Sequence, residues 1–324
     1  MAASPLPAMQ YRTFGRTGLR VSLLGLGTGG PSQLGQGSGV PEADAANLVR
    51  YALDCGVNLI DTAANYRDSE AILGRALRGV PRDRYVLCTK FGPVDRKGEQ
   101  VLPAEALEQS LERSLQRLGL DHVDVFQLHG IEPQRYAAIK ERFLPVLERA
   151  QAAGKCRFIG ITETFGADGS KAMLPMALAD DVWDTIMIGY NMLTLNPAEP
   201  KILPLAAERN VGVLVMCAVR RAIARPDKLA EVIRDLKARG KLAADALPDE
   251  DPLGWLVHDA VDSVPSAAYK YVAANPAVST VLTGTANRAH FDDNVRAILG
   301  PPLPATDTAR LQALFGNVGE NLGN

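Results

Sequence analysis

Four ionisable side chains stand at or just beyond the ends of apolar, strand-like segments of this sequence. Asp61 ends one such segment, and Tyr66 follows it five residues later, in the next loop. Lys90 ends the next segment, and His129 directly follows the one after that. Buried strands that each finish in an ionisable group predict a functional site at the carboxyl ends of a sheet.

A carboxylate, a phenol, an ammonium and an imidazole at one place suit proton transfer to a carbonyl oxygen. A free tyrosine titrates near ~10, too high for ready proton exchange at neutral pH. An ammonium at Lys90 would lower the pKa of Tyr66, and Asp61 would keep that ammonium charged and oriented. Tyr66 would then be a general acid in reduction and a general base in oxidation. His129 would hydrogen-bond the substrate oxygen and orient it.

Each of the four residues has a purely structural alternative. Asp61 alone could cap the loop after its strand, and Tyr66 could be an aromatic on a rim. Lys90 could be a solvated strand end, and His129 a hydrogen-bonded structural histidine. Their placement at matched strand ends favours a site over coincidence.

Composition excludes several other classes of protein. The 324 residues are 47% hydrophobic and 22% charged, with a formal net charge of −2. That charge gives no basic face for nucleic acid. The four cysteines form no C-x-x-C pair, which indicates buried thiols rather than a metal site or a disulfide framework. The first residues lack the features of a signal peptide, and no apolar run is long enough to span a membrane, so we expect a cytoplasmic protein.

Strand-like and helix-like segments alternate along the chain. The expected strands are Leu23–Gly27, Val57–Asp61, Tyr85–Lys90, Val123–Leu128, Arg157–Thr162, Thr185–Tyr190, Val211–Cys217 and Val278–Thr283. The expected helices are Glu42–Cys55, Ser69–Leu77, Ala104–Leu118, Tyr136–Ala153, Lys171–Ala179, Lys201–Arg209, Ala267–Asn275 and Ala289–Leu299. Eight strand–helix units predict an α/β protein, a (β/α)₈ TIM barrel that forms a single domain over residues 1–324.

Three further features refine this prediction. An open doubly wound sheet is disfavoured, because Gly25–Gly30 does not form a G-x-G-x-x-G turn that opens a helix. Tyr11–Val21 predicts a hairpin that turns at Thr17 and Gly18 and plugs the barrel floor. Pro226–Ala246 predicts an extra helical insertion after the seventh strand of the barrel.

These motifs resemble the aldo-keto reductase superfamily. The matching runs are Gly-Val-Asn-Leu-Ile-Asp-Thr-Ala-x-x-Tyr at 56–66, Thr-Lys-Phe-Gly at 89–92, Asp-Val-Phe-Gln-Leu-His at 124–129, the opening stretch 12–22 and Asp-Asp-Asn-Val at 292–295. The resemblance covers about Tyr11 to Leu299. It implies hydride transfer between NAD(P)H and the carbonyl carbon of an aldehyde, ketone or sugar, with an extended dinucleotide across the strand ends. It also implies Tyr66 as acid/base, Lys90 and Asp61 as its tuning pair, and His129 as the orienting group.

The expected contacts to the nicotinamide are altered in this chain. Thr162 and Glu163 stand where the family usually has Ser-Asn, and an ionised glutamate can only accept hydrogen bonds. Met187 stands for a glutamine, and Cys217 aligns with an aromatic residue that stacks on the nicotinamide. The candidate cofactor-binding residues are Gly27, Thr28, Thr162, Glu163, Tyr190, Cys217, Arg220, Arg221, Gly284, Arg288, His290, Asp293 and Asn294. Arg220 and Arg221 depart from the family's usual loop; they could bind the pyrophosphate or belong to a solvated charged loop.

The cofactor and the substrate are predicted only in outline. Arg288 and His290 are candidates for a 2′-phosphate, so NADP(H) is favoured over NAD(H), although Gly284 occupies the family's stronger basic position. The polar loop Gln33–Ser38 favours a polar substrate such as a sugar. Two other functions stay open on the same barrel: a catalytically weak, dinucleotide-binding regulatory protein, and a lyase or isomerase. The sequence does not indicate an oligomeric state.

Overall fold

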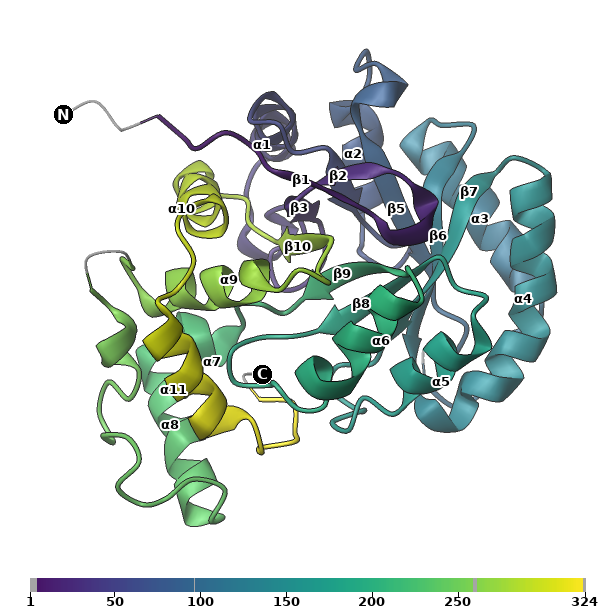
Figure 1. The fold of residues 1–324 in the computed structure, drawn as a ribbon. Coiled ribbons are helices and arrows are strands. Elements are labelled where there is room, and N and C mark those ends of the chain that lie inside the picture. Colours follow the sequence, from purple (N-terminus) through teal and green to yellow (C-terminus); the bar gives the residue numbers. More distant parts are fainter. Residues whose placement is uncertain (1–4, 96, 259–260, 323–324) are drawn as a thin grey trace.

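The computed structural model describes residues 5–95, 97–258 and 261–322. Eight parallel strands close into a barrel in the order β10-β3-β4-β5-β6-β7-β8-β9 (Figure 1). The strands are β3 (Leu24–Gly27), β4 (Leu59–Asp61), β5 (Val86–Phe91), β6 (Val123–Ile131), β7 (Cys156–Glu163), β8 (Thr185–Gly189), β9 (Gly212–Met216) and β10 (Thr280–Thr283). The predicted (β/α)₈ barrel is therefore confirmed.

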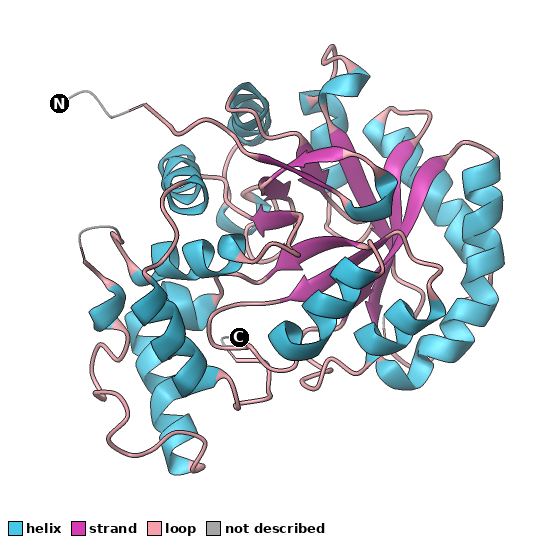
Figure 2. Ribbon diagram, viewed as in Figure 1, coloured by secondary structure: helices cyan, strands magenta, loops and turns pink. Residues whose placement is uncertain are grey.

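Helices surround the strands on the outside, as Figure 2 shows. They are α1 (Glu42–Asp54), α2 (Ser69–Ala76), α3 (Glu105–Leu118), α4 (Tyr136–Ala152), α5 (Met173–Asp180), α6 (Leu203–Glu208), α7 (Arg221–Ala224), α8 (Pro226–Ala238), α9 (Val264–Ala274), α10 (Arg288–Leu299) and α11 (Ala305–Phe315). α3 shows why they pack this way. Its four leucines at helical spacing are all buried, and the helix ends at Gly119, whose φ of 67° is easy only for glycine.

The barrel interior near the amino ends of the strands is filled with apolar side chains, most of them from alternate positions of the barrel strands. These side chains are Phe14, Val21, Leu59, Val86, Cys88, Val125, Met187 and Leu214. Two of them, Phe14 and Val21, come from the N-terminal hairpin of β1 (Tyr11–Thr13) and β2 (Arg20–Ser22). The hairpin packs tightly against β9. Gly15 lies so close to the backbone of Gly212 that an added Cβ would collide with it. The predicted hairpin is present, and it closes the barrel floor.

The segment after β9 differs in detail from the prediction. The helical insertion is present as α8, which begins at Pro226 as predicted but ends at Ala238 rather than Ala246, and the short helix α7 precedes it. The reason is Gly240, which has a φ of 67° and breaks the helical path. α11 was not expected from the sequence. Figure 1 shows α7, α8 and α11 together on one side of the barrel.

In the described parts of the chain, no helix is both long enough and apolar enough to cross a membrane.

Candidate active site

Strands β4, β5 and β6 bring the ionisable residues to the barrel mouth by simple alternation. Leu59, Cys88 and Val125 fill the barrel interior. Since side chains alternate along a strand, the residues two positions further on face the same interior, one layer nearer the carboxyl ends. Those residues are Asp61, Lys90 and Gln127, and His129 lies two positions beyond Gln127.

Lys90 is the centre of this layer. Its side chain has no exposed surface, and its Nζ donates to Asp61 Oδ2 at 2.6 Å and to the carbonyl oxygen of Thr62 at 2.8 Å. The amide of Gln127 donates to the other carboxylate oxygen of Asp61 at 3.3 Å. A buried charge needs such partners, and here the ammonium and the carboxylate have several between them.

Tyr66 reaches this pair from the loop after β4. Its ring centre lies 4.9 Å from Lys90 Nζ, and its hydroxyl lies 3.4 Å from His129 Nε2. The tyrosine and histidine rings meet edge to face, with centroids 5.6 Å apart. Gly29 makes room for the phenol, because a Cβ there would collide with the Tyr66 ring. The structure thus brings together the four residues that the sequence singled out.

The electrostatics of the site partly differ from expectation. Burial raises the pKa of Tyr66, and the positive charge of Lys90 offsets only part of that rise. We expected a net lowering, so that expectation is wrong for the structure as described. Burial lowers the pKa of Lys90, but Asp61 and Tyr66 together outweigh it and the net pKa is raised, so the ammonium stays charged. Burial, reinforced by Lys90, lowers the pKa of His129 to about 3, so this imidazole is neutral at physiological pH.

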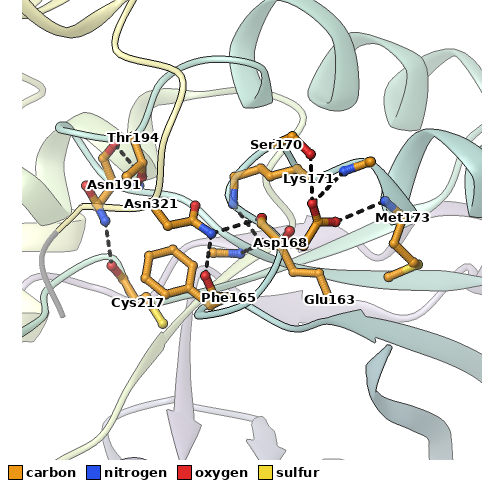
Figure 3. Close-up of polar contacts among 12 residues, drawn as sticks. Glu163, Phe165, Asp168, Ser170, Lys171, Met173, Asn191, Thr194, Cys217 and Asn321 are labelled. Atoms are coloured by element: carbon orange, nitrogen blue, oxygen red, sulfur yellow. Dashed lines mark hydrogen bonds and ion pairs between the residues drawn. The ribbon is translucent and has the colours of Figure 1, made fainter. Parts of the chain in front are cut away.

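On the β7 side of the mouth, a second buried ion pair joins Glu163 to Lys171 (Figure 3). Lys171 Nζ donates to Glu163 Oε1 at 2.8 Å, and neither side chain has exposed surface. The same oxygen accepts the backbone N–H of Gly189 at 2.6 Å, whereas Glu163 Oε2 is buried without a hydrogen-bond partner. Beside it, the hydroxyl of Thr162 accepts the backbone N–H of Gly130 at 2.7 Å, next to His129.

The loop after β9 lies against this pair. Cys217 has a positive φ of 64°, and its sulfur accepts a hydrogen bond from Arg220 at 3.0 Å. The guanidinium of Arg220 also lies 5.2 Å from the ring centre of Phe165, which comes from the loop after β7. Arg221 begins α7.

The remaining candidates lie around β3, β10 and the start of α10. Gly284 lies beside the end of β3, since a Cβ there would stand in van der Waals contact, at 3.5 Å, with the carbonyl oxygen of Gly27. The backbone N–H of Thr28 donates to the carbonyl of Asp61 at 2.9 Å, which ties the end of β3 to the end of β4. Arg288 lies with its guanidinium 3.8 Å from the ring centre of Tyr51 on α1.

Three other candidates share the first turns of α10 with Arg288. The backbone N–H of His290 donates to the side chain of Asn287, which caps the helix. Asp293 pairs with Arg296 at 3.2 Å, and Asn294 follows it on the same helix. The roles of these residues stay predictions.

Tyr190 and Met187 lie apart from the four ionisable residues. Tyr190 is buried among the side chains between barrel and helices, and its hydroxyl donates to Glu199 at 2.5 Å. Met187 belongs to the apolar filling of the barrel. Any contact of Tyr190 with a cofactor therefore also stays a prediction.

The sequence reasoning missed four residues of this region. Gln127 could have been found, because it lies two positions before His129 on the same face of one strand. The others, Lys171, Phe165 and Asn321, sit in loops or in the tail. No local pattern marks them.

Among the described residues, no group of three or more histidine, cysteine, aspartate or glutamate side chains is arranged to hold a metal ion.

Comparison with known proteins agrees with this geometry. A family model described as the aldo/keto reductase family matches residues 23–315. The chain belongs to this family.

Two curated relatives of this chain are oxidoreductases by name. L-galactose dehydrogenase of Arabidopsis thaliana is 30% identical over 304 residues, which cover 90% of this chain and 88% of the relative. The NADH-specific methylglyoxal reductase of Escherichia coli is 31% identical over 234 residues, covering 66% of this chain and 69% of the relative. The holo form of an aldo-keto reductase from Bacillus halodurans shares the fold with a TM-score of 0.68 at 24% identity, over 98% of each chain.

Proposed function

We propose that this aldo/keto reductase transfers a hydride between a nicotinamide dinucleotide and the carbonyl or alcohol carbon of a small polar substrate, with a sugar as the favoured class. The observation that carries the proposal is Lys90. It is fully buried, bonded to Asp61 on one side and 4.9 Å from the Tyr66 ring on the other. A buried lysine ammonium costs several kcal/mol to desolvate, and its use here is to tune a phenol.

The residues at the mouth fit a dinucleotide. Glu163 Oε2 is a buried acceptor without a partner, and a carboxamide N–H could satisfy it. Thr162 and Glu163 would hold the nicotinamide end, and Arg220 and Arg221 the pyrophosphate. Arg288 and the start of α10 would hold the adenosine end, where NADP(H) is favoured over NAD(H).

Each catalytic side chain then has a defined task. The bound cofactor supplies or takes the hydride. In reduction, the Tyr66 hydroxyl gives its proton to the carbonyl oxygen, and in oxidation the phenolate takes it back. Lys90 stabilises that phenolate, and Asp61 keeps Lys90 charged and in place. His129 is neutral, so it can donate one hydrogen bond to the substrate oxygen without competing for the proton.

The loop over the mouth supports a polar substrate. The backbone N–H of Gln33 donates to the carbonyl of Gly29, the residue that packs on Tyr66. Gln33 Oε1 is buried without a partner and could accept a sugar hydroxyl. The relative that oxidises L-galactose agrees with this class. Comparing KM for aldoses with KM for apolar aldehydes of similar size tests the preference.

Tyr66→Phe tests the proposal as a whole. The substitution removes the hydroxyl that moves the proton and keeps the ring packed on Gly29. Turnover should fall by about 10²–10⁴-fold, while dinucleotide affinity stays within a few-fold. Rates come from the nicotinamide absorbance and affinities from fluorescence quenching. Turnover at the wild-type rate would remove Tyr66 from the mechanism. A wild-type protein that binds a dinucleotide but turns nothing over would favour a regulatory protein instead.

A further inference from the structure

Phe165 is an aromatic side chain at the barrel mouth that the proposed mechanism does not use. It comes from the loop between β7 and α5, and its ring lies directly on the backbone of Gly189, where an added Cβ would collide with it. Gly189 lies two positions beyond Met187, whose side chain fills the barrel interior. By alternation, the ring covers the interior face of β8 at its carboxyl end.

Two cations lie over this ring. Lys171 Nζ is 5.1 Å and the Arg220 guanidinium carbon 5.2 Å from its centre. Lys171 is fully buried, whereas Arg220 is partly exposed, so Arg220 covers the ring on the side toward solvent. A guanidinium is flat and positively charged, and it stacks on aromatic faces for that reason. Another flat cation can take the same position once Arg220 moves aside.

The loop that carries the ring is held from two sides. Asn321, in the C-terminal tail, donates to the carbonyl oxygens of Phe165 and Asp168, as Figure 3 shows. The carboxylate of Asp168 in turn accepts the backbone N–H of Ala172 and that of Met173, each at 3.0 Å, at the start of α5. These contacts fix the loop before any ligand binds, so the ring position does not depend on induced ordering.

The neighbouring loop after β9, residues 217–220, contains no aromatic side chain. The loop after β9 offers Cys217 at the position that aligns with the family's stacking residue, and the Cys217 sulfur is bonded to the same Arg220 that covers Phe165. Cys217 has no flat surface, so an aromatic contact on this side of the mouth has to come from another element.

We infer that Phe165 is the surface on which the nicotinamide ring stacks, in place of an aromatic at position 217. This inference rests on the proposed function, because it requires a nicotinamide cofactor. The oxidised ring is a flat cation, like the guanidinium that covers Phe165 in the structure, whereas the reduced ring is neutral. Phe165 therefore strengthens binding of the oxidised cofactor more than binding of the reduced one.

Calorimetric titration of the purified protein separates this role from a general effect on the loop. The ligands are the oxidised and the reduced dinucleotide, and the matching ADP-ribose (with or without the 2′-phosphate), which has no nicotinamide. Phe165→Leu should weaken binding of the oxidised form by about tenfold and binding of the reduced form by less, and it should leave the affinity for ADP-ribose unchanged. Phe165→Tyr keeps the aromatic face and should bind all three ligands within about twofold of wild type.

Gly189→Ala gives a second, independent variant, because its methyl group displaces the ring without removing it. It should reproduce the loss seen in Phe165→Leu, and adding it to Phe165→Leu should cost little more. Wild-type affinity of Phe165→Leu for the oxidised form, or an equal loss for ADP-ribose, would overturn the inference and leave the proposed function standing. A wild-type protein that binds neither dinucleotide would refute the proposed function and the inference together.

Discussion

Lys90→Met removes the one charge that links Asp61 to Tyr66, with little change in side-chain length. In the structure the ammonium lies 2.6 Å from Asp61 Oδ2 and 4.9 Å from the centre of the Tyr66 ring. At an effective dielectric constant of about 20, a unit charge at that second distance stabilises a phenolate by about 3 kcal/mol, or roughly two pKa units. Solvent near the partly exposed Tyr66 side chain reduces this to about one to two units.

The pKa of Tyr66 should therefore rise further in this variant, and the two reaction directions should respond differently. Below its pKa, the phenolate fraction falls tenfold for each unit of rise. Alcohol oxidation at neutral pH should slow by about 10–100-fold, and its alkaline limb should move up by about one to two pH units. Carbonyl reduction needs the protonated phenol and should lose less. Initial rates in both directions between about pH 6 and pH 10.5 measure the difference.

The same substitution should lower stability with a definite dependence on pH. The pKa of Lys90 is raised in the folded state, so its contribution is complete below the unfolded value and is lost only as pH rises through the folded one. At neutral pH the variant leaves the Asp61 carboxylate buried and without its cation, a cost of about 3–5 kcal/mol. Burial raises the pKa of Asp61, so the folded state takes up a proton more readily than the unfolded state. The deficit should shrink as pH falls from about 7 toward 4.

Asp61→Asn combined with Lys90→Met is the matched control. It removes both charges, so its thermal midpoint should depend less on pH than that of Lys90→Met alone. An oxidation profile that keeps its shape and position in Lys90→Met would refute the electrostatic coupling between Lys90 and Tyr66. A stability deficit that does not change with pH would refute the unpaired Asp61 as its cause.

Two further substitutions test the other charged groups. Lys171→Met leaves Glu163 buried and unpaired, at a cost of about 3–5 kcal/mol, which for 324 residues lowers the thermal midpoint by about 4–7 °C. Adding Glu163→Gln should restore most of the lost stability. A midpoint unchanged in the single variant would contradict the buried pair. Arg288→Ala should weaken NADPH binding by about 10–100-fold and leave NADH binding unchanged in fluorescence titrations. An equal loss for both cofactors would show that Arg288 does not contact the 2′-phosphate.

The sequence by itself determined the barrel and the layer of ionisable residues at its mouth. Each strand of the site is an apolar run that ends in an ionisable residue, and parallel strands of one barrel end at the same face. Once Asp61, Lys90 and His129 were seen at strand ends, their meeting followed from topology alone. Tyr66 lies only five residues beyond Asp61, so the short connecting loop keeps it close to the same end of the barrel.

The environment of these residues could not be predicted from the sequence, because burial depends on all the elements that pack around a site. The raised pKa of Tyr66 is an example: the nearby lysine could be expected, but the desolvation that outweighs it could not. The end of α8 depended on the positive φ of Gly240, which no periodicity in the sequence predicts.

Only the tertiary structure determined which side chains lie together on the β7 side of the barrel mouth. Asn321 bonds to Phe165 from 156 residues away along the chain, and the Phe165 ring meets Gly189 and Arg220 from two other strand ends. These contacts join loops and a tail, whose conformations are fixed by their partners and not by a local repeat of apolar residues. The four candidate catalytic residues are encoded by short-range pattern, whereas the surroundings that set their pKa values and shape the proposed cofactor site arise from long-range packing.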